Sequence, residues 1–215
     1  MRNKFDEQLR QLNREMITMG NMIECAIQDA ISAFINQDVE KAKKIMADDE
    51  FVDHKQKTIE NICFQLLIQQ QPVARDLRTI TAAMKMVTDM ERIGDQAADI
   101  SELTIMMSKT PYRLNTEHIN AMATETVIML IQAVEAYVER DMKKAQAVID
   151  HDAVVDDMYL KVKSDLIEVM STDTDYAECA ADLLMVNKYL ERIGDHATNI
   201  AEWVIFSIDD HSENK

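Results

Sequence analysis

The sequence predicts an all-α protein built as two tandem three-helix bundles, with six long helices in total. Three observations predict this fold. The 215 residues include only three glycines and two prolines, so little of the chain is suited to turns. Apolar residues recur every three or four positions along almost the whole chain, which is typical of amphipathic helices. The segment at residues 91–100 also returns at residues 191–200, which indicates a duplicated unit related by an internal pseudo-twofold repeat.

Both copies of the repeated segment begin with Glu-Arg-Ile-Gly-Asp. In a helix, Glu91, Asp95 and Asp99 stand one turn apart and fall within a sector of roughly 80°. Like charges at this spacing repel by roughly 0.2–0.5 kcal/mol per pair. We therefore expect a positive group beside them, either an Arg, a Lys or a metal cation.

Two of the three glycines, Gly94 and Gly194, occupy the same place in the two copies. A glycine inside a helix costs about 1 kcal/mol relative to alanine. Such a cost usually marks the close approach of a backbone or a ligand. We expect a neighbour to lie against each of these glycines.

The first half is expected to hold three helices. An apolar heptad covers residues 4–36, and Asp38 is placed to cap the next helix, predicted over 39–70. Pro72 ends that helix, because proline cannot continue the hydrogen-bonded ladder. The third helix, 73–109, carries the first acidic motif.

The apolar stripe of the helix at 39–70 contains one acid, Asp49, with Asp53 one turn further on. A carboxylate on a buried stripe is costly unless it is paired or binds a cation. A second interpretation is an end of the bundle that is open to water.

The second half repeats this order with helices at 115–139, 142–170 and about 175–208. Asp152 and Asp156 correspond to Asp49 and Asp53. The segment around Lys109 and Pro111 lies between the halves, so we expect one repeat at 1–111 and another at 112–215.

The loop positions predict that the acids of neighbouring helices meet. Asp53 and Glu91 each lie about 19 residues from Pro72, so they stand at similar heights in an antiparallel pair. Asp156 and Glu191 are likewise symmetric about the next turn, near residue 173. The sequence therefore predicts two acidic clusters, one in each half.

Composition excludes several classes of protein. The net charge of −16 disfavours nucleic acid as a partner, because phosphate neutralisation needs clustered Lys and Arg. The three cysteines, Cys25, Cys63 and Cys179, are expected to be buried, reduced thiols. The N-terminus does not resemble a signal peptide, and no run approaches the ~18 apolar residues that span a bilayer. We expect a cytoplasmic protein with no membrane insertion.

Three segments resemble the PhoU family of phosphate-transport regulators: residues 71–78, residues 89–95 and residues 189–202. The resemblance extends over essentially the whole chain. It implies two three-helix bundles in a cytoplasmic, dimeric protein that is not an enzyme. It also implies negative regulation of phosphate uptake and of phosphate-starvation signalling. The implied partners are the ATPase subunit of the phosphate-specific ABC transporter and a sensor histidine kinase.

The resemblance further implies divalent or trivalent metal ions, including iron clusters, bound through the acidic motifs. Oxygen ligands suit such hard cations. Asn199 replaces the acid found at Asp99, so we expect weaker cation binding in the second half. Carried over by position, the metal ligands are Asp49, Asp53, Glu91, Asp95 and Asp99 in the first half, and Asp152, Asp156, Glu191, Asp195 and Asn199 in the second.

Three alternatives stay open at this level. Arg92 and Arg192 flank the acids and could form a salt-bridge network in place of a metal site. A ferritin-like di-metal oxidase would use Glu-x-x-His pairs, and no Glu in this chain has His three residues later. A metal-free helical scaffold is the third alternative. His196 is expected on the surface or beside the metal ligands.

Overall fold

The computed structural model describes residues 2–69, 72–109 and 117–209. Regular structure in these ranges is helical throughout. The elements are α1 (Arg2–Asn36), α2 (Val39–Gln69), α3 (Ala74–Met107), α4 (Glu117–Glu139), α5 (Met142–Thr172), a 3-10 turn η1 (Thr174–Tyr176) and α6 (Ala177–Ile208).

The six predicted helices are confirmed, each with bounds within two residues of the expected ones. The prediction that Pro111 marks the boundary between repeats lies outside the described residues. The limits 1–111 and 112–215 therefore stay a prediction.

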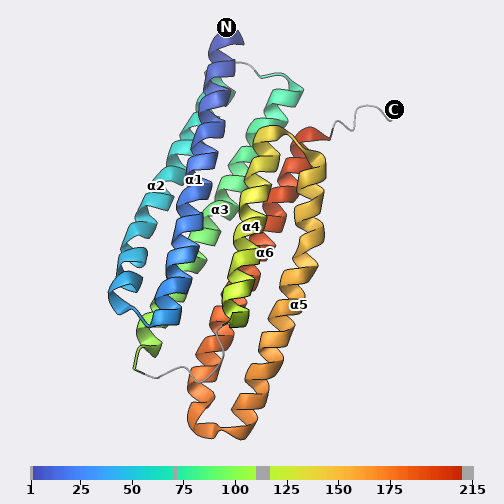
Figure 1. The fold of residues 1–215 in the computed structure, drawn as a ribbon. Helices are drawn as coiled ribbons and strands as arrows, with labels where there is room; N and C mark the ends of the chain where they lie inside the picture. The colour runs from blue at the N-terminus through green and yellow to red at the C-terminus, as the bar shows by residue number, and fades with distance from the viewer. Residues whose placement is uncertain (1, 70–71, 110–116, 210–215) are drawn as a thin grey trace.

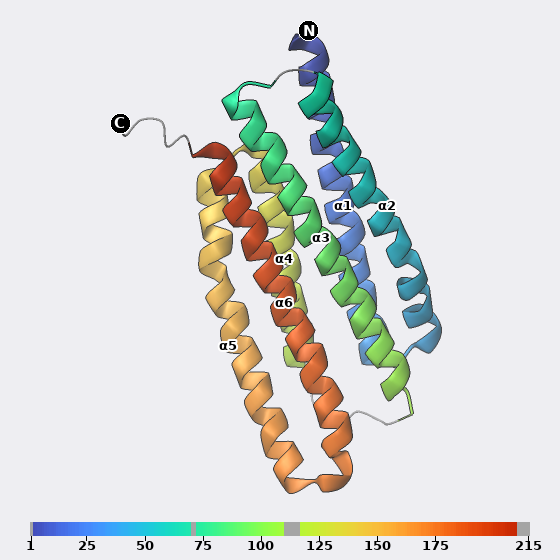
Figure 2. The same cartoon turned by 180° about the vertical axis from the view of Figure 1, so that it is seen from behind.

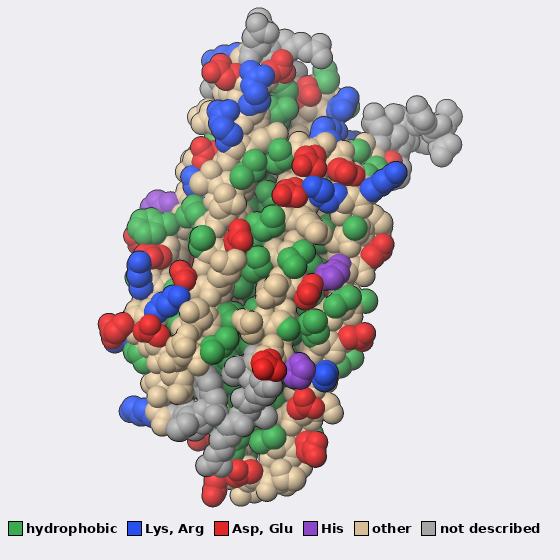
Figure 3. Space-filling view, viewed as in Figure 1, with side chains coloured by type: hydrophobic (Ala, Val, Ile, Leu, Met, Phe, Trp, Pro, Cys, Tyr) green, Lys and Arg blue, Asp and Glu red, His purple; other side chains and the backbone are tan. Residues whose placement is uncertain are grey.

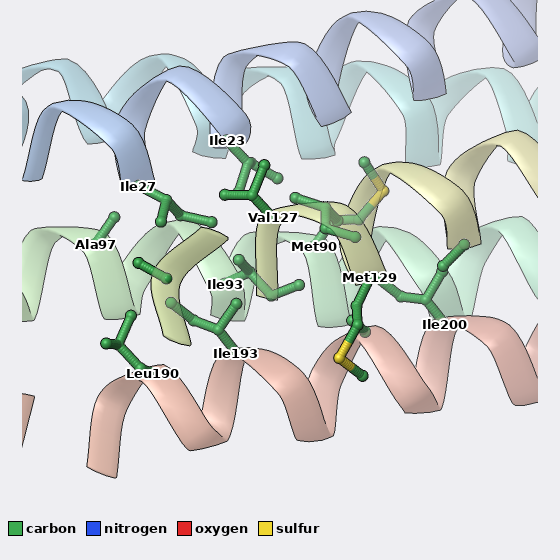
Figure 4. Close-up of a cluster of buried hydrophobic side chains, with 14 of the residues drawn as sticks. Ile23, Ile27, Met90, Ile93, Ala97, Val127, Met129, Leu190, Ile193 and Ile200 are labelled. Carbon is green, nitrogen blue, oxygen red and sulfur yellow. The ribbon is translucent and has the colours of Figure 1, made fainter. Parts of the chain in front are cut away.

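The two halves lie side by side as long bundles, α1 to α3 in one and α4 to α6 in the other (Figure 1). Seen from behind, α3 and α6 run next to each other through the middle of the molecule (Figure 2). Apolar side chains of α1, α3, α4 and α6 meet at the centre, where Ile27, Ile93, Val127 and Ile193 face one another (Figure 4). The halves thus share one hydrophobic core.

The turns that end the first helix of each half have the same construction. Gln37 and Arg140 adopt left-handed conformations, with φ of 52° and 56°. The carboxylate of Asp38 then accepts a hydrogen bond from the amide of Lys41, as predicted for a helix cap. The Asp141 carboxylate accepts hydrogen bonds from the amides of Lys143 and Lys144. These caps set the short turns that place α2 and α5 antiparallel to the preceding helices.

The expectation that no segment approaches the apolar character of a membrane-spanning helix needs correction. By length and composition alone, α4 could cross a bilayer, with a mean hydropathy of 1.3 over its most apolar window. However, 56% of that window is buried inside the bundle. The buried core helix of a bundle can pass the same test of length and composition. Here α4 packs against α1, α5 and α6. The apolar character of α4 is thus explained by the core.

The cysteine prediction was partly wrong. Cys63 and Cys179 are buried, whereas Cys25 is exposed. Cys25 lies on the side of α1 that faces away from the shared core, roughly opposite the buried Ile23 and Ile27. On the face shown in Figure 3, apolar side chains gather along the line where α1 and α4 meet.

Candidate functional site

The second and third helices of each half approach closely at a glycine. A Cβ atom added at Gly94 of α3 would lie 3.1 Å from Cγ1 of Val52 and 3.3 Å from Oδ1 of Asp49, both on α2. At Gly194 of α6, the corresponding distance to Cγ1 of Val155 on α5 is 3.2 Å. Glycine therefore lets the acid-bearing helix pack against the motif helix in both halves.

Five acidic side chains gather at this contact between α2 and α3, and we call them the first acidic cluster. Burial and the nearby charges of Asp95, Asp53 and Asp99 raise the pKa of Asp49 to about 6. All five side chains are half-buried. The predicted convergence of the two helices at one level is thus present in the structure. The members of the first acidic cluster are Asp49, Asp53, Glu91, Asp95 and Asp99.

Two further carboxyls of the cluster are perturbed in the same direction. Burial, and then the charge of Asp95, raises the pKa of Glu91. Burial and the charge of Asp95 also raise the pKa of Asp99. Burial is the largest cause of the raised pKa at Asp49, Glu91 and Asp99, and repulsion from neighbouring acids adds to it, which makes the ionised cluster costly without a cation.

A polar pocket of about 430 Å³ opens beside the cluster, between α2, α3 and α6. Its lining includes Asp49, Asp95 and Asp99 together with Arg192 and His196 from the other half. The buried Gln96 also lines it, and its Oε1 atom has no hydrogen-bond partner among the residues that the structure describes. A buried amide oxygen without a partner calls for a donor or a cation.

The positively charged side chains beside the cluster are arginines, mainly Arg92 of α3 itself. Arg92 lies 3.0 Å from Asp95 and 3.6 Å from Glu91. Its side chain is 55% exposed, so it covers the cluster from the outside and does not seal it. Arg192 on α6 lowers the pKa of Asp99 against the opposing effects of burial and neighbouring acids. The expected pairing of both arginines with acids is therefore present in part.

The second acidic cluster comprises Asp152, Asp156, Glu191 and Asp195. Burial and the charge of Asp156 raise the pKa of Asp152. Burial, Glu191 and Asp152 raise the pKa of Asp195. These mutual effects place the acids of α5 and α6 at one level, as the loop symmetry predicted.

The second cluster differs from the first in two ways. Asp156 and Asp195 are exposed, whereas Asp53 and Asp95 are half-buried. Lys188 also forms an ion pair with Glu191 from one turn away on α6. The second cluster is therefore more open to water and carries its own ammonium group.

Asn199 is directed toward the other half of the molecule. Its amide donates a hydrogen bond to Oδ1 of Asp89 on α3, at 3.3 Å. His196 contacts the same oxygen through Nδ1, at 2.9 Å. The histidine is thus half-buried at the junction between the halves. This differs from the expected surface position and agrees with the other expectation, a place beside the acidic residues.

The oxygen atoms of the two clusters are of the type that hard cations prefer, and they stand at the same height on neighbouring helices. Carboxylate and amide oxygens are the ligands that Mg, Ca, Mn and iron prefer in proteins. Within residues 2–69, 72–109 and 117–209, however, no three His, Cys, Asp or Glu side chains already converge on one point at metal-binding distance. An ion would have to draw the carboxylates inward by rotation of their side chains.

Sequence comparison identifies the family. The profile of the PhoU domain matches residues 16–104 and again residues 119–204. The chain belongs to the PhoU family. The PhoU matches correspond to the two helical halves described above and confirm the tandem repeat.

Individual PhoU relatives cover almost all of the chain. A phosphate-specific transport system accessory protein PhoU homolog from Clostridium acetobutylicum is 38% identical over 208 residues, which is 96% of this chain and 95% of that protein. A protein of the same name from Caulobacter vibrioides is 35% identical over 205 residues, covering 95% of this chain and 89% of that protein.

Two solved PhoU structures have the same fold. The crystal structure of PhoU from Pseudomonas aeruginosa superposes with a TM-score of 0.90 at 29% identity, over 95% of this chain and 98% of that chain. The phosphate transport system regulatory protein PhoU from Streptococcus pneumoniae gives a TM-score of 0.86 at 25% identity, over 94% and 96% of the two chains.

Sequence reasoning missed the contacts between the halves. Asp89 lies only two residues before Glu91 but points about 200° away from it around the helix, toward α6. That angle could have assigned it to another interface. The pairing of Lys188 with Glu191 was also missed, although their spacing of three residues on one helix could have indicated it. Thr88 stands at the matching place in the first half.

Proposed function

We propose that this PhoU-family chain is a cytoplasmic, non-enzymatic regulator that lowers phosphate uptake by the phosphate-specific ABC transporter and restrains phosphate-starvation signalling. The family assignment carries this proposal, because PhoU relatives that span the chain are named accessory proteins of that transport system. In the proposed scheme the partners are the ATPase subunit of the transporter and a sensor histidine kinase, and the regulator acts as a homodimer.

The two acidic clusters are proposed to bind divalent or trivalent metal ions, iron among them. The concentration of raised carboxyl pKa values at Asp49, Glu91 and Asp99 supports a cation at the first cluster. In the second half, Asp152, Asp156, Glu191 and Asp195 would hold the ion. Asn199 would have to leave Asp89 to join them, so we propose that it contributes least.

A metal here would supply fixed positive charge and no reaction. Asp49 and Asp53 of α2 would hold such an ion together with the acids of α3, and the shared ion would link the two helices. The acids of α5 and α6 would do the same in the second half. The sequence has no Glu followed three residues later by His, the pair that di-metal oxidases use. Oxygen consumption by the iron-loaded protein would contradict the non-enzymatic proposal.

Association with the transporter tests the regulatory proposal. The purified chain, immobilised, should retain the ATPase subunit of the transporter, and cells lacking the chain should take up phosphate faster in phosphate-rich medium. The Asp165→Lys variant, on an exposed face of α5 away from both clusters, is the matched control and should behave as the wild type. Unchanged uptake together with no association under rich or starved conditions would contradict the proposal.

A further inference from the structure

A second, apolar groove opens on the first half, between α1 and α2, and the two acidic clusters do not account for it. Its volume is about 450 Å³. Gly94 and Ala98 of α3 line it between the other two helices, Met22 and Ala26 line it from α1, and Val52 lines it from α2. We call this region the α1–α2 groove. Its size lies within the range of ligand-binding clefts.

Ion pairs join α1 to α2 on both sides of the groove. Lys41 of α2 lies 2.7 Å from Asp29 of α1, near the turn between the helices. Lys55 of α2 lies 2.8 Å from Glu15 of α1, further along. Between these two ion pairs, no hydrogen bond or further ion pair joins the two helices among the described residues. The helices are therefore fixed at two points, with an open apolar interval between them.

The second half closes the matching interval. Numbers there are higher by 103, as Asp141 is relative to Asp38. Met22 and Asp48 correspond to Glu125 and His151, and these two side chains meet at 2.8 Å across α4 and α5. The first half has an apolar and an acidic side chain where the second has a bridge. The two halves therefore differ at this interval in charge and in the contact that joins the helices.

The edge of the groove is acidic. Asp48 lies along it on α2 and forms no ion pair within the described part of the chain. Asp49, a member of the first acidic cluster, also lines the groove. The exposed Phe51 stands beside them with 55% of its surface accessible. An apolar floor with an uncompensated acidic edge is complementary to an apolar surface that carries Lys or Arg along one side.

The length of the groove suits a helix. Its lining on α1 runs from Thr18 to Asp29, which is about 16 Å at 1.5 Å per residue. That distance equals three turns of a partner helix. Grooves between helices commonly take the apolar face of an amphipathic helix, whose contacts repeat every three or four residues.

We propose that the α1–α2 groove docks a basic amphipathic helix of the transporter's ATPase subunit. The inference rests on the proposed function, since it names the surface through which that association is made. The apolar face of the partner helix packs over Ala26 and Gly94, and its basic edge pairs with Asp48. In the second half the ion pair of Glu125 with His151 stands where Met22 and Asp48 line the groove, so the partner helix is proposed to bind the first half.

Cys25 provides a probe at the groove that requires no substitution. It is the exposed cysteine among the three and lines the groove, whereas Cys63 and Cys179 are buried. Alkylation of the folded protein with a bulky maleimide should weaken binding of the purified ATPase subunit by at least about tenfold, because the label occupies the partner's place. The matched control carries the same label at residue 128 in the variant Cys25→Ser/Ile128→Cys. Ile128 is 39% exposed and holds the corresponding position in the second half, so this control should bind as the wild type does.

Charge reversal tests the acidic edge separately. Asp48→Lys should weaken binding about tenfold at low ionic strength, and less in high salt. Asp165→Lys makes the same change of charge on an exposed part of α5 and should leave affinity unchanged. Circular dichroism and thermal unfolding check that each variant is folded.

The outcomes separate the two proposals. Weakening by the Cys25 label and by Asp48→Lys, with both controls unaffected, supports the groove as the docking surface. Wild-type affinity in the labelled protein overturns the groove inference and leaves the regulatory proposal standing. Failure of the unmodified protein to bind the ATPase subunit overturns both. A label that dissociates a homodimer without affecting ATPase binding assigns the groove to a second copy of the chain and also overturns the inference.

Discussion

At the scale of single residues, Asp49 shows that an ionised carboxylate in the first acidic cluster lowers the stability of the fold. Its carboxyl packs against Gly94 and is surrounded by Asp53, Asp95 and Asp99. In the folded state its pKa is about 6, against 3.8 for an unperturbed Asp. The folded state therefore holds this proton more tightly than the unfolded state does.

The first prediction follows from the sign of that shift. Between about pH 4 and pH 6 the folded state binds more protons than the unfolded state, so stability falls as pH rises through this window. Asp49→Asn removes the buried charge. We expect the free energy of unfolding at pH 7 in EDTA to rise by about 1 kcal/mol, a value discounted for screening by solvent.

Urea unfolding of both proteins at pH 7 and at pH 4 provides the measurement. The gain should shrink at pH 4, where the wild-type carboxyl is already protonated. Asp165→Asn is the control and should change stability by less than about 0.5 kcal/mol at either pH. A loss of stability in Asp49→Asn at pH 7 would show that the carboxylate stabilises the fold.

A second prediction concerns the glycines. Alanine at Gly20 would meet Cγ2 of Val134 at 3.5 Å, an ordinary contact, so Gly20→Ala should stabilise the helix by about 1 kcal/mol. At Gly94 the added Cβ would lie 3.1 Å from Val52, and α2 would have to shift. We expect Gly94→Ala to gain nothing or to lose stability. Equal gains in thermal unfolding at both positions would refute the idea that glycine is needed for contact between α2 and α3.

At the scale of the helices, the matching caps at the starts of α2 and α5 explain why the two halves share one geometry. Each cap fixes a short antiparallel turn after a left-handed residue. We predict that Asp38→Ala and Asp141→Ala each lower the free energy of unfolding by about 1 kcal/mol. Chemical denaturation measures this, with Asp165→Ala on the exposed face of α5 as control. No loss in either cap variant would mean that the turns are held by packing alone.

The helices were predictable from the sequence because apolar spacing, caps and Pro72 act locally. The level at which Asp49 and Asp53 meet Glu91 was also predictable, because two hairpins of matched length give the same register. The side-chain partners across helices were not. Asn199 and His196 contact Asp89 of the other half through packing of α3 against α6, which no local pattern encodes.

The exposed Cys25 was missed for a related reason. Cys25 lies off the apolar stripe of α1, and the α1–α2 groove opens beside it, so α2 does not cover the thiol. Helical periodicity predicts which side of a helix turns inward. It does not predict where two packed helices leave an opening.

At the scale of the whole molecule, the two halves share one core through α1, α3, α4 and α6. We therefore predict a single cooperative unfolding transition, because neither half can expose its share of the core without the other. Differential scanning calorimetry in EDTA should give equal calorimetric and van't Hoff enthalpies. Two resolved transitions would show that the repeats are independent domains.

The repeat also makes two related cation sites that are not equal. The first cluster has five carboxylates, and Arg92 covers it from outside. The second is more exposed, carries Lys188 and has Asn199 engaged elsewhere. We expect the first to bind a divalent cation more tightly than the second.

Calorimetric titration of the EDTA-treated, dialysed protein with Mn²⁺, with metal content checked by elemental analysis, tests the central claim most directly. The account predicts stoichiometric binding to the wild type, loss of the tighter phase in Asp49→Asn/Asp95→Asn, and loss of the weaker phase in Asp152→Asn/Asp195→Asn. Binding isotherms that are the same for the wild type and for the variant with all four substitutions would contradict it.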